Sequence, residues 1–182
     1  MEPLIKSFLR EGKISVTGIL FLGLIFMMGC GTPKQTSQNP QNFQELRDLV
    51  NSREFSIEFQ WAQPQGGGMI DLMSNPNHIR FKGEEVDIFL PYFGIRHSGG
   101  GYGSNTGGII YTGMVSNLNV TEDSSKMNIL LKFEGRHDSE VLIFNVTLYE
   151  NGKAHANVSS SERTNIIYHG GDVKATSQVI ER

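Results

Sequence analysis

Cysteine is almost absent from this chain of 182 residues, which contains only Cys30. A single thiol cannot close an intrachain disulfide, so the fold has to be stabilised by its hydrophobic core. An excess of positive charge is missing as well, because 16 lysines and arginines face 19 aspartates and glutamates. Nucleic-acid binding depends on a basic surface, so the net charge of −3 argues against that class of partner.

The chain also lacks an apolar run long enough for a membrane-spanning helix, which needs about 20 residues. Its most apolar uncharged run covers residues 14–29 and follows the basic residues Lys6, Arg10 and Lys13. This order and length are typical of the apolar region of a signal peptide. The run ends at Gly29, directly before Cys30.

A basic start, an apolar run and a small residue before cysteine together resemble a bacterial lipoprotein signal. By that resemblance, residues 1–29 are a signal peptide, and Cys30 becomes the first mature residue and carries a diacylglycerol and an N-linked acyl chain. Several acyl chains, at about 0.8 kcal/mol per buried methylene, hold a protein stably on a membrane. The polar residues 30–41 are then a flexible tether, and residues 42–182 are a single β-rich domain. The alternative interpretation is an uncleaved signal anchor with a free cysteine.

The residues that follow Cys30 contain no acidic cluster. In Bacteroidetes lipoproteins such a cluster resembles a surface-export signal, so its absence favours an outer-membrane protein that faces the periplasm.

One segment, residues 42–53, has helical periodicity. Phe43, Leu46, Leu49 and Val50 fall on one face, and charged and amide residues fall on the other. This predicts one amphipathic helix near the start of the domain, packed against an end or a face of a sheet.

Beyond this segment the hydrophobic period changes to two, which predicts half-buried strands. The pattern is clearest at residues 55–61, 79–81, 86–90, 127–133 and 154–158, and residues 141–149 form the most hydrophobic predicted strand, which we expect to be central. Asn151-Gly152 predicts a type I′ hairpin, and residues 166–168 predict a last short strand. Alternating helices are missing, so we expect a mainly β fold: an antiparallel β-sandwich or small barrel of about eight strands with one N-terminal helix.

An ordered set of residues resembles a family of Bacteroidetes lipoproteins that contain a domain of unknown function (number 4251). Its most specific element is Leu90-Pro91-Tyr92-Phe93-Gly94. The other matching positions are Phe55 and Ile57, Ile79 to Gly83, Gly103 and Gly108, Gly152 and Ala154, and Ser161, Arg163, Ile167, Tyr168 and Gly170. The resemblance implies an exported, lipid-anchored β domain, and it brings no catalytic residue with it.

Motifs for catalysis or metal binding are missing. No G-x-S-x-G nucleophile elbow occurs, and the glycine-rich loop at residues 99–108 lacks the spacing of a phosphate-binding loop. The five histidines show neither His-x-His nor His-x-x-x-His spacing. We therefore expect a non-enzymatic protein without a cofactor or a metal.

One surface combines aromatic area with hydrogen-bond donors at the end of the predicted strand 86–90, a mixture common at recognition sites. Its residues are Tyr92, Phe93, Arg96, His97 and Tyr102. The alternative interpretation is that Tyr92 and Phe93 close one end of the core while Arg96 is solvated.

Three functions remain open from the sequence. The first is a lipid-anchored, non-catalytic domain that binds a small ligand or an envelope partner. The second is a purely structural or assembly role in the envelope. The third is a hydrolase built on His97 or His169 with a distant acid.

Overall fold

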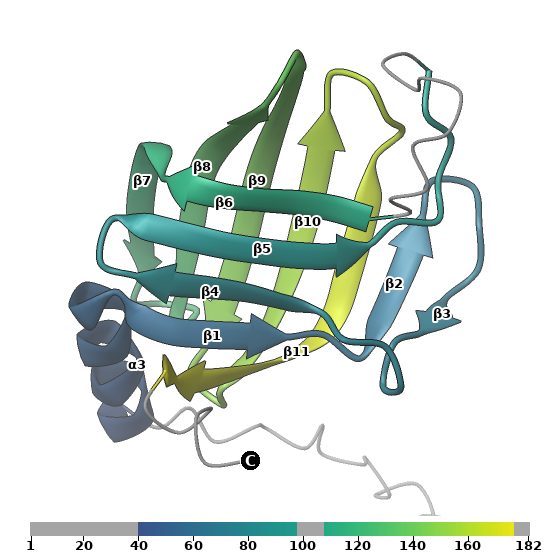
Figure 1. Ribbon diagram of the computed structural model, residues 1–182. Helices are drawn as coiled ribbons and strands as arrows, with labels where there is room; N and C mark the ends of the chain where they lie inside the picture. Colours follow the sequence, from purple (N-terminus) through teal and green to yellow (C-terminus); the bar gives the residue numbers. More distant parts are fainter. Residues whose placement is uncertain (1–39, 98–107, 177–182) are drawn as a thin grey trace, which may run out of the picture. The chain divides into compact units, whose positions relative to one another are not determined.

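Strands dominate the structure, a computed structural model that describes residues 40–97 and 108–176 (Figure 1). It begins with the helix α3 (Pro40–Ser52), and eleven strands follow. The first six are β1 (Glu54–Glu58), β2 (Trp61–Pro64), β3 (Ile70–Asp71), β4 (His78–Lys82), β5 (Glu85–Pro91) and β6 (Gly108–Met114). The others are β7 (Ser116–Asp123), β8 (Asn128–His137), β9 (Glu140–Tyr149), β10 (Lys153–Ser160) and β11 (Ile166–Ala175).

The strands form one antiparallel sheet in the order β6-β5-β4-β1-β11-β10-β9-β8-β7, and β2 pairs with β11 and β3. The sheet folds over on itself, so that β1, β4, β5 and β6 cross in front of β7 to β10 (Figure 1). The ring of Tyr111 on β6 packs over Gly135 on β8, which makes the sheet a nearly closed barrel. The predicted mainly β fold is confirmed, with more strands than the eight expected.

Strand β11 belongs to both layers because it changes partner along its length. Ile166–His169 pair with β2, whereas Asp172–Ala175 pair with β1. Gly170 lies between these halves with a φ of +67°, a conformation that favours glycine. The predicted last strand at residues 166–168 is therefore too short, because the glycine pair bends the strand instead of ending it.

An asparagine side chain completes the sheet where the chain passes from β1 to β2. The backbone N–H of Phe59 donates to Asn77 Oδ1 at 2.7 Å, and Asn77 Nδ2 donates to the carbonyl of Phe59 at 3.0 Å. Asn77 is buried. The amide of Asn77 thus forms the hydrogen bonds that the N–H and C=O of Phe59, which are buried between β1 and β2, cannot form with a neighbouring strand or with water.

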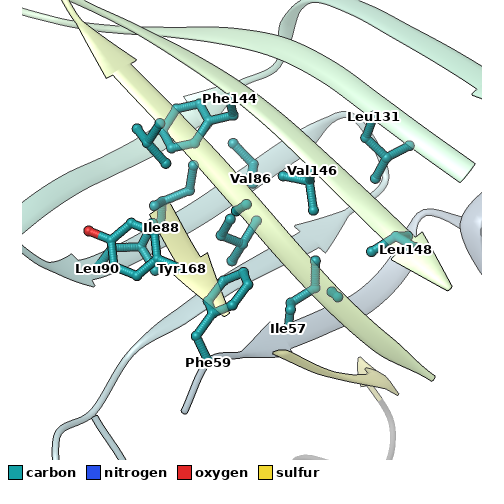
Figure 2. Close-up of a cluster of buried hydrophobic side chains, with 14 of the residues drawn as sticks. Ile57, Phe59, Val86, Ile88, Leu90, Leu131, Phe144, Val146, Leu148 and Tyr168 are labelled. Carbon is teal, nitrogen blue, oxygen red and sulfur yellow. The ribbon is translucent and has the colours of Figure 1, made fainter. Parts of the chain in front are cut away.

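Aromatic rings fill the space between the two layers. Phe55 stacks on Phe81 with ring centroids 4.7 Å apart, Phe81 meets the edge of Phe133 at 5.3 Å, and Phe133 stacks on Phe144 at 4.8 Å. Figure 2 shows further aliphatic side chains from β1, β5, β8 and β9 gathered in the same cluster. The interior between the layers is therefore a packed core.

The predicted helix is present, with Phe43, Leu46 and Val50 buried along one face. It packs against β1 and β9. Arg53 ends it in the left-handed conformation with a φ of +53°, and its N–H donates to the carbonyl of Val50. Within residues 40–97 and 108–176, the structure contains no helix with the length and apolar character needed to span a membrane.

The hairpin at Asn151-Gly152 is present, but the predicted type I′ turn is wrong. Gly152 has a φ of +72°, whereas Asn151 is not among the residues with positive φ. The N–H of Gly152 donates to the carbonyl of Tyr149 at 3.0 Å. The loop is therefore a right-handed turn followed by a glycine in the left-handed conformation. A loop of this kind has one residue more than the two-residue type I′ turn.

We expect Gly171→Ala to destabilise the fold, because a Cβ there would lie 2.9 Å from side-chain atoms of Ile57 and Phe59 and 3.0 Å from Ala154. Overpacking of this kind costs about 1–3 kcal/mol. Urea denaturation measures the loss, and Gly68→Ala is the matched control because a Cβ at Gly68 meets nothing within 4 Å. Equal midpoints for the two variants would contradict the close packing at the bend.

Candidate functional site

The sequence-predicted surface at the end of β5 is mostly engaged inside the fold. The hydroxyl of Tyr92 lies 2.9 Å from the carbonyl oxygens of Ile95 and Thr164 and 2.9 Å from Thr164 Oγ1. The N–H of Ile95 also donates to Thr164 Oγ1 at 3.1 Å. Tyr92 thus ties the segment after β5 to the connection between β10 and β11.

Two carboxylates are buried in the same region: Glu162 in this connection and Glu140, the first residue of β9. Arg163 donates from Nε and Nη2 to Glu140 at 2.8 and 3.0 Å, and its Nη1 donates to the carbonyl of Gly108 at 2.8 Å. Arg96 Nη2 donates to Glu162 at 2.8 Å. Hydrogen bonds from Ser139 and Arg96 hold the pKa of Glu162 below its ordinary value. Charged groups buried at this depth are stable only when they are paired in this way.

We call this set the polar clamp: Tyr92, Arg96, Ser139, Glu140, Glu162, Arg163 and Thr164. It explains the most specific part of the family resemblance. The guanidinium of Arg163 lies 5.2 Å from the centroid of the Tyr92 ring, and the hydroxyl of Tyr168 donates to the carbonyl of Pro91 at 2.8 Å. A Cβ on Gly94 would clash with the Tyr92 hydroxyl and with Thr164. The Leu-Pro-Tyr-Phe-Gly motif therefore serves the architecture of the fold.

Three residues at the end of β5 remain exposed: Phe93 at 42%, Ile95 at 66%, and His97. The N–H of His97 donates to the carbonyl of Glu162 at 2.7 Å. Tyr102 and the predicted lipidation site Cys30 lie outside the described residues. The structure thus leaves an apolar pair at the surface and uses the predicted polar groups of Tyr92 and Arg96 within the protein.

We expect Arg163→Ala to destabilise the protein by about 3–5 kcal/mol, the cost of leaving one partner of a buried ion pair uncompensated. The side chains of Arg163 and Glu140 are only 8% and 3% exposed. Chemical denaturation is the measurement, and Arg136→Ala, an exposed arginine on β8, is the control with a small effect. A loss no larger than that of the control would show that the clamp does not stabilise the fold.

A second region lies on the outer face of β9, β10 and β11. Leu148, Ala156 and Tyr168 point into the core and are fully buried, so the alternating residues point outward. Tyr149, His155 and His169 form a stacked row there, with ring centroids 6.0 and 6.5 Å apart. We call these three residues the ring row.

Hydrogen bonds orient the ring row. The Tyr149 hydroxyl lies 3.0 Å from His155 Nδ1, and His169 Nε2 lies 3.1 Å from Gln63 Oε1 on β2. Because an amide oxygen only accepts, His169 donates from Nε2. Burial, together with the neighbouring His169, lowers the pKa of His155. His155 is therefore uncharged at neutral pH, and one nitrogen of each imidazole takes no part in these bonds.

An open hollow of about 550 Å³ lies beside the ring row, and we call it the ring hollow. Its lining includes Tyr149, Asn151, Lys153, His155, His169 and Gly170. This volume is in the range of small-ligand sites, and such sites combine apolar area with a few placed polar groups. The ring hollow meets both conditions.

A second open hollow, of about 530 Å³, lies where β1 passes into β2, and we call it the amide hollow. Its polar lining includes Glu58, Gln60, Asn75, Asn77, His78 and Asp172. Met73, 67% exposed, adds apolar surface.

The histidines do not form a metal centre within the described ranges, where no three side chains of His, Cys, Asp or Glu converge. The two histidines considered for hydrolysis have different surroundings. His97 is exposed, and His169 contacts an amide. The histidine that reaches a hydroxyl is His155, through Tyr149. A tyrosine hydroxyl bonded in this way can position a ligand.

Sequence reasoning did not identify the ring row. Its members are six and fourteen residues apart along the chain, and only the pairing of β9, β10 and β11 brings them together. The available signal was weak: each is an outward residue of a strand, and two of them flank the Asn151-Gly152 hairpin.

Comparison with known proteins agrees with this architecture. A family model described as "Domain of unknown function (DUF4251)" matches residues 37–171. The crystal structure of a DUF4251 family protein from Bacteroides eggerthii DSM 20697 is similar to this chain, with a TM-score of 0.58 and 16% sequence identity. The match covers 76% of this chain and 90% of that one. At this level of identity, the similarity concerns the fold alone.

Proposed function

This chain belongs to the DUF4251 family, and on that premise we propose that it is a lipid-anchored, non-catalytic binding domain of the cell envelope. The ligand is a small molecule held in the ring hollow. The observation that carries this proposal is the stacked row of Tyr149, His155 and His169 on the outer face of a rigid sheet, beside an open space of ligand size. Sites built on regular elements hold their side chains in a defined geometry.

The anchor part of the proposal rests on the sequence before the domain. A basic segment and the apolar residues 14–29 end directly before Cys30. Acyl chains on Cys30 attach the protein to the outer membrane, and the domain faces the periplasm at the end of a polar tether. Two or more acyl chains make such an anchor stable.

We expect Cys30→Ser to abolish lipidation. Cells fed labelled palmitate should incorporate label into the wild-type full-length chain and into a Ser37→Ala control, and mass spectrometry should find their leader removed. The Cys30→Ser protein should carry no label and keep its leader. An unlabelled wild-type chain with an intact leader would refute the anchor while leaving the ring hollow untouched.

A structural or assembly role is the second candidate. The observation that favours it is the exposed apolar pair Phe93 and Ile95, which are held in place by the polar clamp beside them. An envelope partner could cover this pair. In that case Phe93→Ser with Ile95→Ser would abolish crosslinking to the partner, whereas changes in the ring row would have no effect.

The binding function is tested by thermal unfolding of the detergent-solubilised full chain with fractionated small molecules from the cell envelope. A ligand at 100 times its Kd stabilises a protein by about 2.7 kcal/mol. For a domain of this size, that raises Tm by roughly 5–10 °C. We expect one fraction to shift the wild type and a His137→Ala control, whose side chain is 60% exposed and lies outside both hollows. The same fraction should leave His155→Ala/His169→Ala unshifted. Equal Tm shifts of the wild type and the double variant, or no Tm shift of the wild type with any fraction, would contradict the proposal.

A further inference from the structure

The charge of the ring hollow points to an uncharged ligand. Its lysine, Lys153, is ion-paired with Asp172, and Asp172 also accepts a hydrogen bond from Gln60 at 3.3 Å. His155 is uncharged at neutral pH, because burial and His169 lower its pKa. Lys153 and His155 therefore give the ring hollow no unpaired positive charge that would select an anion.

The strands beneath the hollow argue against a peptide bound by strand addition. Strand β9 is paired on both sides, with β8 and β10, and β10 is paired with β9 and β11. Strand β11 is paired with β10 on one side and with β1 and β2 on the other. Because these three strands have no open edge, a peptide cannot add to them as a further strand.

The side chains of this face suit a ligand with alternating apolar and hydroxyl surfaces. The ring row presents stacked rings, whose electron-rich faces attract C–H groups. Trp61 on β2 is the antiparallel partner of His169, so its side chain leaves the sheet on the same face. The imidazoles and neighbouring amides supply hydrogen-bond donors and acceptors. A sugar ring combines these two kinds of surface, C–H groups on its faces and hydroxyls at its edge.

The two hollows adjoin. Lys153 lines the ring hollow and Asp172 lines the amide hollow, and the ion pair between them joins the two walls. The side chain of Gln60, in the amide hollow, lies against Gly170, in the ring hollow, within 3.2–3.5 Å of the position a Cβ there would take. A linear ligand can therefore extend from one hollow into the other across this boundary.

We propose that the ligand is an uncharged linear oligosaccharide, with one sugar stacked on the ring row and the following sugars hydrogen-bonded in the amide hollow. This rests on the proposed function and specifies its ligand. Gln60, Asn75 and Glu58 are the groups of the amide hollow that bind hydroxyls, and the Lys153–Asp172 pair lies under the bond between the two subsites.

The chain offers a direct optical probe, because Trp61 is its single tryptophan. The full chain is purified in a detergent without a sugar headgroup and titrated with maltohexaose, cellohexaose and chitohexaose, each compared with its disaccharide. Adenosine and tetra-alanine serve as probes of other chemistry. We expect a saturable change in tryptophan emission with at least one hexasaccharide, and binding about tenfold weaker for its disaccharide, the loss of roughly 1.4 kcal/mol.

Two variants separate the subsites. His155→Ala should weaken binding of both sugar lengths by about tenfold or more, as for a central contact residue. Gln60→Ala should weaken binding of the hexasaccharide alone, and His137→Ala should change the binding of neither sugar length.

Equal affinity for the two sugar lengths, with no effect of Gln60→Ala, would overturn the extended site. A response to adenosine or tetra-alanine but to no saccharide would overturn the ligand class and leave the proposed function standing. If no probe changes the emission while an envelope fraction still raises Tm, the saccharide is wrong and the binding function survives.

Discussion

The partner change of β11 is the constraint on which the rest of the structure depends. Its two halves pair with β2 and β1 in one continuous antiparallel register, from Ile166 opposite Pro64 to Ala175 opposite Phe55. The bend at Gly170 and Gly171 turns this long ribbon and brings β4, β5 and β6 over β8 and β9. The aromatic rings of both layers can then stack, and their burial is the main source of stability in a chain without an intrachain disulfide.

The polar residues of this fold serve two different purposes. In the polar clamp, Glu140 and Arg163 are buried, so each charge has to be matched by a partner. Those groups hold the end of β5 against the connection between β10 and β11. On the outer face, Tyr149, His155 and His169 are only half buried and bond mainly to one another and to an amide. The first set stabilises the fold, whereas the second is half exposed and forms the proposed ligand site.

Strand content was predictable wherever one face of a strand is buried. Residues 141–149 are the most hydrophobic predicted strand, and β9 is an interior strand between β8 and β10, with every second residue buried. Strand β7 has no such signal, because its residues are exposed or half-exposed on both faces at an edge of the sheet. The length of β11 could not be predicted from the sequence for another reason. A glycine pair that bends a strand in three dimensions has the same local pattern as one that ends it.

The sequence by itself determined which side chains face the core, where the helix lies and that no intrachain disulfide supports the fold, since these follow from local periodicity and composition. Tertiary structure alone decided which polar residues meet. Tyr92 and Thr164 are 72 positions apart, and the ring row draws on three strands. The physical reason is register: a shift of one residue turns every side chain of a strand to the opposite face, and that choice is made by packing across the whole sheet.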